Sequence, residues 1–235
     1  MNQATAVTQG EIQQWFNNTY RRLGLTYLRP VEAYILFLEL MQPVADRKLL
    51  DVACGPGQLL MAARPYQLEL YGVDIADVAV DLCKKRLPEA NVQTANAESL
   101  PFANDVFDYI TCLGSLERFL DRKATLQEQY RVGKKGALYC IMVRNRNNLK
   151  WKFFKELLRL KNKKGHQDAL DLQQWRSLFQ EVGFQELKVL PDHWPKLKWS
   201  HYFLKRLGIA VRYKKIPAAN VPIEHTNEFI FLLRK

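Results

Sequence analysis

Apolar and polar positions along most of the chain follow two different periods. From residue 48 onward, short runs rich in aliphatic and β-branched residues are separated by longer segments whose apolar residues recur at helical spacing. The short runs predict strands at residues 49–53, 68–73, 92–95, 107–112, 136–143, 185–190 and 228–233. Strands that alternate with helices predict an α/β fold, in which helices cover both faces of a mostly parallel sheet.

Several helix ends carry recognisable capping residues. Asp77 is expected to cap the helix after the second strand, and Asp121 is expected to cap a helix that ends at Gly133. The segment D-L-Q-Q-W-R-S-L-F-Q-E-V-G-F places its apolar residues, Trp175 among them, on one stripe and ends at Gly183. This segment predicts an amphipathic helix packed on the sheet.

The length of 235 residues predicts a single domain with one core. Residues 1–45 are expected to form a helical lid, and residues 46–145 are expected to form a ligand-binding core. Residues 146–170 carry a dense basic run and are expected to form an insertion or cap. Residues 171–235 are expected to complete the sheet and the substrate side.

The composition narrows the class of protein. The four cysteines are widely separated without a C-x-x-C pair, which indicates reduced, mostly buried thiols rather than disulfides or a metal site. The first residues lack the features of a signal peptide, and the apolar segment A-Y-I-L-F-L-E-L-M is too short to span a bilayer, so a cytoplasmic protein is expected. The net charge of +11 fits an anionic partner, whether nucleic acid, a membrane surface or an acidic metabolite. The oligomeric state is left open.

The stretch L-L-D-V-A-C-G-P-G-Q-L-L has the form of a nucleotide-binding turn. A dinucleotide-binding turn needs a third glycine, and Leu60 occupies that position after Gly55 and Gly57. Asp51 places a carboxylate beside the turn, which suits a cation better than a diphosphate. Asp74 ends the next strand, where a carboxylate can accept both hydroxyls of a ribose. The pattern therefore favours S-adenosylmethionine, which has a sulfonium and no phosphate, over NAD.

Five motifs together resemble a known family. They are D-V-A-C-G-P-G, G-V-D-I, A-E-S-L-P-F, F-D-Y-I-T-C-L-G-S-L-E and R-V-G-K-K-G. Their order and spacing over roughly residues 49–145 resemble class I S-adenosylmethionine-dependent methyltransferases, in the broad group that includes the quinone C-methyltransferases. The resemblance implies a Rossmann-like three-layer sandwich with a seven-stranded sheet and an N-terminal helical extension. It also implies S-adenosylhomocysteine as the product.

The resemblance assigns cofactor contacts to individual positions. The methionine part of the cofactor is expected to lie against Asp51, Ala53, Gly55 and Gly57. The ribose and adenine are expected to contact Asp74, Ile75, Asn96 and Ala97. Leu113, Gly114 and Ser115 would lie beside the sulfonium.

The substrate side is less completely assigned. Ser115, Arg118 and His193 are expected to face the substrate, and Arg118 stands where many members of the family have histidine. No catalytic base is assigned. Tyr20 and Tyr27 are candidates for covering the sulfonium, and Arg29 is a candidate for pairing with the methionine carboxylate.

The basic run at residues 144–164 has one apolar face and one charged face. Such a segment fits a lid, a helix resting on anionic lipid or a nucleic-acid contact. The leading functional hypothesis is a small-molecule methyltransferase. An RNA methyltransferase and a non-catalytic cofactor-binding subunit are the alternatives.

Overall fold

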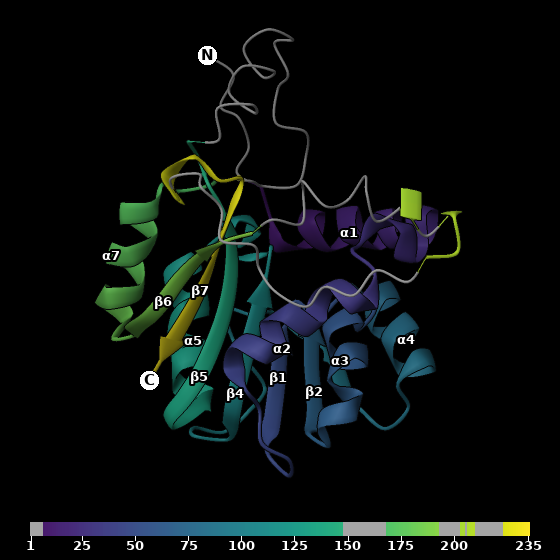
Figure 1. Ribbon diagram of the computed structural model, residues 1–235, viewed down its shortest axis with the longest axis horizontal. Coiled ribbons are helices and arrows are strands. Elements are labelled where there is room, and N and C mark those ends of the chain that lie inside the picture. The colour runs from purple at the N-terminus through teal and green to yellow at the C-terminus, as the bar shows by residue number, and fades with distance from the viewer. Residues whose placement is uncertain (1–6, 148–167, 193–202, 205, 210–222) are drawn as a thin grey trace, which may run out of the picture.

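The computed structural model of the chain describes residues 7–147, 168–192, 203–204, 206–209 and 223–235. Within these ranges the chain folds as a sheet between two layers of helices, as the alternating pattern predicts (Figure 1). No helix of this described part has the length and apolar content needed to cross a membrane.

The sheet has seven strands in the order β3-β2-β1-β4-β5-β7-β6. Their bounds are β1 Lys48–Val52, β2 Glu69–Asp74, β3 Asn91–Thr94, β4 Phe107–Leu113, β5 Gly133–Arg144, β6 Gln185–Pro191 and β7 Glu228–Arg234. Strands β1 to β5 pair in parallel, whereas β7 runs antiparallel to both β5 and β6. Each predicted strand overlaps an observed one, and the prediction of a mostly parallel sheet is confirmed.

Six helices accompany the sheet in the described residues. They are α1 Gln9–Leu23, α2 Ile35–Met41, α3 Gln58–Ala63, α4 Asp77–Arg86, α5 Arg122–Val132 and α7 Leu172–Val182. Short 3-10 turns lie at η1 Gly24–Tyr27, η2 Val31–Tyr34, η3 Arg64–Tyr66, η4 Leu116–Arg118 and η5 Ile223–His225. Helices α5 and α7 cover one face of the sheet, and α2, α3 and α4 cover the other (Figure 1).

Strand β5 shows how the alternation of apolar residues builds two cores. Tyr139 and Ile141 pack in the cluster that includes residues of α5 and α7. Cys140 and Met142 point to the opposite face and pack in the cluster that includes residues of α2, α3 and α4. Because successive side chains of a strand point to opposite faces, a strand buried on both sides is apolar throughout. All four cysteines are buried free thiols, as expected from their spacing.

Helix α7 follows its predicted pattern closely. The Asp171 side chain accepts a hydrogen bond from the Gln174 N–H at 2.9 Å and forms a capping box with that residue. Gly183 ends the helix with φ of 109°, a left-handed conformation that glycine adopts without steric cost. Trp175 is fully buried, so the apolar stripe faces the core.

The two other predicted caps have different outcomes. Asp121 caps α5 by accepting from the Ala124 N–H at 2.9 Å, which confirms that prediction. The cap predicted at Asp77 is wrong, because the N-cap of α4 is Ala76 and Asp77 lies in the first turn. The Asp74 carboxylate accepts the Ala76 N–H at 2.9 Å and thereby sets the turn that precedes α4.

Helix α1 lies across the edge of the sheet at which the parallel strands end (Figure 1). The Gln13 side chain donates to the Ile75 carbonyl at 2.9 Å, and Asn17 accepts from the Val78 N–H at 3.1 Å. Strands β1 and β4 are neighbours, and the chain leaves them toward opposite sides of the sheet. In open α/β sheets, ligands bind at such a switch point. Helix α1 therefore covers the edge where a ligand site is expected.

Candidate functional site

The loop after β1 has an unusual backbone. Ala53, Gly55 and Gly57 have φ of 59°, 52° and 78°, and all three lie in the left-handed region. A Cβ atom on Gly55 would come within 2.8 Å of the Tyr20 hydroxyl oxygen, so the glycine allows α1 to pack directly on the loop. Ala53 adopts a conformation that costs a non-glycine residue about 1–2 kcal/mol. Such strain is characteristic of ligand-binding loops.

Asp74 joins this loop to the turn before α4. One carboxylate oxygen accepts from the Gly55 N–H at 2.8 Å, and the other accepts from the Ala76 N–H at 2.9 Å. Burial raises the pKa of Asp74 to about 6, although these N–H groups favour the ionised form. Each oxygen retains a lone pair for a further donor. Asp74 therefore organises the loop and has spare capacity to accept ligand hydroxyls.

Asp51 is the second buried carboxyl group at this edge. Burial raises its pKa to about 7, and the neighbouring charge of Asp74 adds to the effect. The Thr111 hydroxyl donates to one Asp51 oxygen at 2.7 Å and opposes the shift. A cation bound nearby would favour ionisation of both carboxyls, since opposite charge stabilises the charged form. The electrostatics of the site therefore suit a cationic ligand.

Two adjoining cavities open at this edge of the sheet. The first, of about 570 Å³, is lined by these predicted residues: Ala53, Asp74, Ile75, Asn96, Ala97, Ser115 and Arg118. The second, of about 900 Å³, is lined by these: Asp51, Ala53, Gly55, Leu113, Gly114, Ser115 and Arg118. The structure thus gathers side chains from four separate stretches of sequence around a continuous space.

Gly57 is the one described residue of the predicted site that lines neither cavity. A Cβ atom there would lie 2.4 Å from the Cys83 sulfur, so the missing side chain makes room for α4. The neighbouring Cys54 is buried, and its contact with Cys83 raises the pKa of the Cys54 thiol well above its usual range, as does burial. A thiol in this state is poorly suited to nucleophilic attack.

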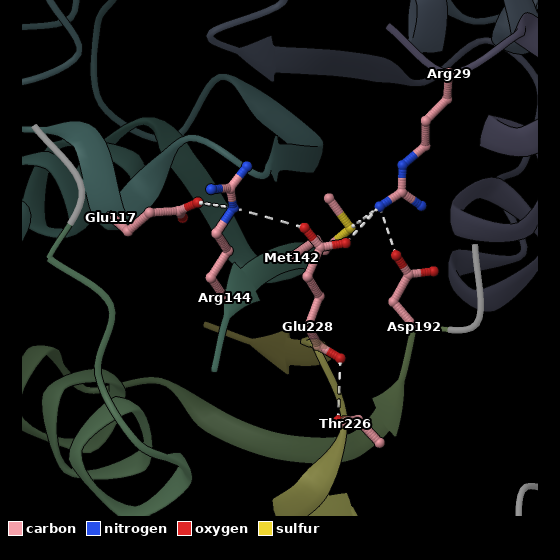
Figure 2. A network of polar contacts seen from close by, with 7 residues as sticks. All are labelled: Arg29, Glu117, Met142, Arg144, Asp192, Thr226 and Glu228. Carbon is pink, nitrogen blue, oxygen red and sulfur yellow. Dashed lines mark hydrogen bonds and ion pairs between the residues drawn. The ribbon is translucent and has the colours of Figure 1, made fainter. Parts of the chain in front are cut away.

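Arg29, Arg144 and Glu228 line the larger cavity and belong to the network of polar contacts that Figure 2 shows. Arg29 donates to Glu228 at 2.8 Å and forms a second, shorter contact with Asp192. Arg144 lies 3.3 Å from Glu117 and 3.7 Å from Glu228, measured from its Nε atom to the carboxylate oxygens. Burial raises the pKa of Glu228 to about 7, while Arg29 opposes this shift. Arg29, expected to meet a cofactor carboxylate, is thus already paired with carboxylates of the chain.

Other predicted positions cannot be placed in the site. His193 and residues 148–167 of the basic run lie outside the described residues, as does the side chain of Tyr27.

Tyr20, by contrast, lines both cavities, together with Phe16 of the same helix. In the described part of the chain, no group of three or more His, Cys, Asp or Glu residues could hold a metal ion.

Several cavity residues escaped the motif-based interpretation. They are Ile12, Phe16, Tyr34, Met142, Arg144 and Glu228. The apolar spacing of Ile12 and Phe16 could have marked one face of α1, since residues four apart lie on the same side of a helix. Glu228 carried no comparable signal, because it reaches the site only through the antiparallel pairing of β7 with β5.

Part of the chain is similar to known methyltransferases. Residues 50–141 match the family model described as a methyltransferase domain. An uncharacterized methyltransferase, YcgJ of Bacillus subtilis, is 28% identical over 166 residues, which cover 65% of both chains. The ubiquinone/menaquinone biosynthesis C-methyltransferase UbiE of Geotalea daltonii is 36% identical over 104 residues, which cover 40% of this chain and 44% of the relative. The matched part thus spans less than two thirds of the length of these relatives.

A solved structure supports the same fold over nearly the whole chain. Phosphoethanolamine N-methyltransferase 2 of Haemonchus contortus, solved with S-adenosylmethionine, has a TM-score of 0.71 at 16% identity and covers 98% of this chain and 60% of that one. The predicted Rossmann-like sandwich and the resemblance to class I S-adenosylmethionine-dependent methyltransferases are confirmed.

Proposed function

We propose, from the membership of residues 50–141 in the methyltransferase-domain family, that the chain is an S-adenosylmethionine-dependent methyltransferase acting on a small molecule. The observation that carries the proposal is the pair of adjoining cavities at the switch point between β1 and β4. The smaller cavity contains a buried carboxyl at the end of β2, and the larger one adjoins it and offers room for the methionine part of the cofactor and for an acceptor.

The residues of the first cavity fit the adenosine part of the cofactor. Asp74 would accept the ribose hydroxyls, because it lines this cavity and its carboxylate oxygens keep unused lone pairs. Asn96 accepts from the Glu98 N–H at 3.0 Å, which holds the side chain against the same cavity, where the adenine edge would lie. Asp51 would favour the positive end of the cofactor, since burial raises its pKa and a nearby cation would stabilise the ionised form.

The larger cavity would receive the acceptor beside the methionine part of the cofactor. Bound S-adenosylmethionine supplies a methyl group already activated by the sulfonium. The chain has to align the acceptor with that methyl and exclude water, and such positioning contributes about 7–11 kcal/mol to lowering a barrier. Phe16 and Tyr20 contribute to both tasks, because they line the space shared by the two cavities and belong to the helix that covers it.

A small molecule is favoured over a larger acceptor by the partly enclosed geometry of this space. The name of the UbiE relative assigns it to ubiquinone/menaquinone biosynthesis, which supports a small-molecule acceptor. RNA and a non-catalytic role remain alternatives that the following experiment separates.

The proposal is tested by binding and transfer measurements on the purified chain. Calorimetry is expected to detect binding of S-adenosylmethionine and S-adenosylhomocysteine but not of NAD. Isotope-labelled methyl from S-adenosylmethionine is then expected to enter a small-molecule filtrate of a cell extract and to leave purified RNA unlabelled. Labelled RNA would replace the small-molecule assignment, and binding without any transfer would support a cofactor-binding subunit. Absence of S-adenosylmethionine binding would overturn the proposal.

A further inference from the structure

Arg118 occupies a central place in the site. It ends η4, the short turn after β4, and it lines both cavities. Only 7% of the residue is exposed. Its position corresponds to the boundary between the space assigned to the adenosine and the space assigned to the acceptor, so it lies where donor and acceptor would meet.

The guanidinium of Arg118 is surrounded by aromatic rings rather than by carboxylates. Its Cζ atom lies 5.5 Å from the ring centre of Phe16 and 6.0 Å from that of Trp15. Its Nη1 atom is buried and has no hydrogen-bond acceptor. Among the residues that the structure describes, no carboxylate forms an ion pair with Arg118. The adjacent Glu117 pairs with Arg144 instead.

This environment leaves the Nη1 donor of the Arg118 guanidinium without a hydrogen-bond acceptor. A guanidinium does not lose its proton in a protein, so the side chain stays charged. Contacts with aromatic rings stabilise a desolvated cation, but they do not satisfy the in-plane N–H donors. A buried donor without an acceptor destabilises the protein, and more so when it belongs to a charged group. A bound oxyanion would remove this cost and could engage two N–H groups at once.

We propose that Arg118 binds a carboxylate or phosphate group of the methyl acceptor. This inference rests on the proposed function, and it names the class of acceptor as anionic. The other arginines at the larger cavity, Arg29 and Arg144, already have carboxylate partners within the chain. An anion beside Arg118 would also offset the repulsion between the guanidinium and the sulfonium of the cofactor, since both are cations.

The cofactor has a carboxylate of its own, which is the competing source of an oxyanion. Its methionine part is expected near Asp51 and Gly55, and these residues line only the larger cavity. Arg118 also lines the smaller cavity beside Asn96 and Ala97. An acceptor group bound at the boundary therefore accounts for the position of Arg118 better than the methionine carboxylate does.

The test uses the purified chain and a small-molecule filtrate separated on an anion-exchange resin. Labelled methyl from S-adenosylmethionine is expected to enter compounds that the resin retains. Arg118→Gln is expected to lower the rate of labelling at limiting acceptor by about ten- to a hundredfold, the loss of one charged hydrogen bond. Its affinity for S-adenosylhomocysteine should stay near that of the wild type. Arg118→Lys should recover part of the activity, and Arg64→Gln, a change at an exposed residue paired with Glu89, serves as the control.

Three results would overturn the inference. Labelling confined to compounds that pass through the resin would show a neutral or cationic acceptor. A folded Arg118→Gln variant that labels retained compounds at the wild-type rate would remove the role of the side chain. Weaker binding of S-adenosylhomocysteine, with unchanged binding of methylthioadenosine, would assign Arg118 to the cofactor carboxylate. Failure of the proposed function differs from failure of this inference, because the wild type would then transfer no methyl group to either fraction.

Discussion

Replacing Asp74 with Asn changes the charge at the end of β2 while keeping the size of the side chain. Burial raises the pKa of this carboxyl from 3.8 to about 6, so the folded protein holds the ionised form less favourably than the unfolded chain does. A shift of about two pKa units corresponds to about 3 kcal/mol. Asn avoids this cost of ionisation, but its amide nitrogen cannot accept the N–H bond that one of the two Asp74 oxygens accepts. The stability of the variant relative to the wild type is therefore expected to rise as Asp74 becomes ionised.

The sign of the effect depends on pH. Below pH 3.8, Asp74 is protonated in both states, and the variant should be less stable than the wild type by about 1–3 kcal/mol, the cost of one buried donor left without an acceptor. As the pH rises through about 6, the wild type loses the stability that the raised pKa represents, and the variant does not. The stability of the variant relative to the wild type should therefore rise between these values by about 3 kcal/mol or less and then level off. Chemical unfolding of both proteins over this pH range measures this difference in the free energy of unfolding.

Ligand binding should respond in the opposite direction. An ionised carboxylate is a stronger acceptor for ribose hydroxyls than an amide, so Asp74→Asn is expected to weaken S-adenosylhomocysteine binding by about tenfold or more at pH 8. Asp81→Asn, at an exposed position on α4, is the matched control and should change neither quantity. A difference in stability between the variant and the wild type that does not change between pH 3.8 and pH 8 would refute the electrostatic reasoning. Unchanged ligand affinity would place the ribose elsewhere.

Three further predictions address other parts of the site and core. Because the pKa of Asp51 is about 7, affinity for cationic S-adenosylmethionine should rise from pH 6 to pH 8, and calorimetry should find this rise absent in Asp51→Asn. Gly57→Ala should destabilise the fold by about 1–3 kcal/mol in chemical unfolding, because the new Cβ would lie 2.4 Å from the Cys83 sulfur. Adding Cys83→Ala should restore part of the loss, and reduced ligand affinity at unchanged stability would contradict this prediction. Trp175→Phe should lower the free energy of unfolding by about 1–3 kcal/mol, since it removes a 3.0 Å hydrogen bond to the Arg144 carbonyl and leaves a cavity; unaltered stability would refute it.

Local patterns determined most of the secondary structure. Strand β5 is apolar on both faces and helix α7 has one apolar stripe, and each pattern belongs to a single stretch of chain. The same holds for the turn after β1 and for Asp74 at the end of β2, where the residue types alone indicate the chemistry. These features were predictable because they depend on the spacing of neighbouring residues, which the sequence displays directly.

Capping near Asp77 shows where local reasoning begins to fail. Asp77 and Asp74 are both plausible hydrogen-bond acceptors before α4, and the sequence does not rank them. Asp74 accepts the Ala76 N–H because β2 places its carboxylate beside the turn and the glycine loop. The outcome depends on the position of a strand relative to a loop that is 19 residues away in sequence.

Only the tertiary structure decided the partners of the charged residues. Strand β7 enters antiparallel between β5 and β6, and this pairing brings Glu228 opposite Arg144 and within reach of Arg29. No local pattern records which strands become neighbours, since strand order follows from how the whole chain packs. The carboxylates that pair with Arg29 and Arg144 leave Arg118 among aromatic rings, so its availability for a ligand follows from packing rather than from its residue type.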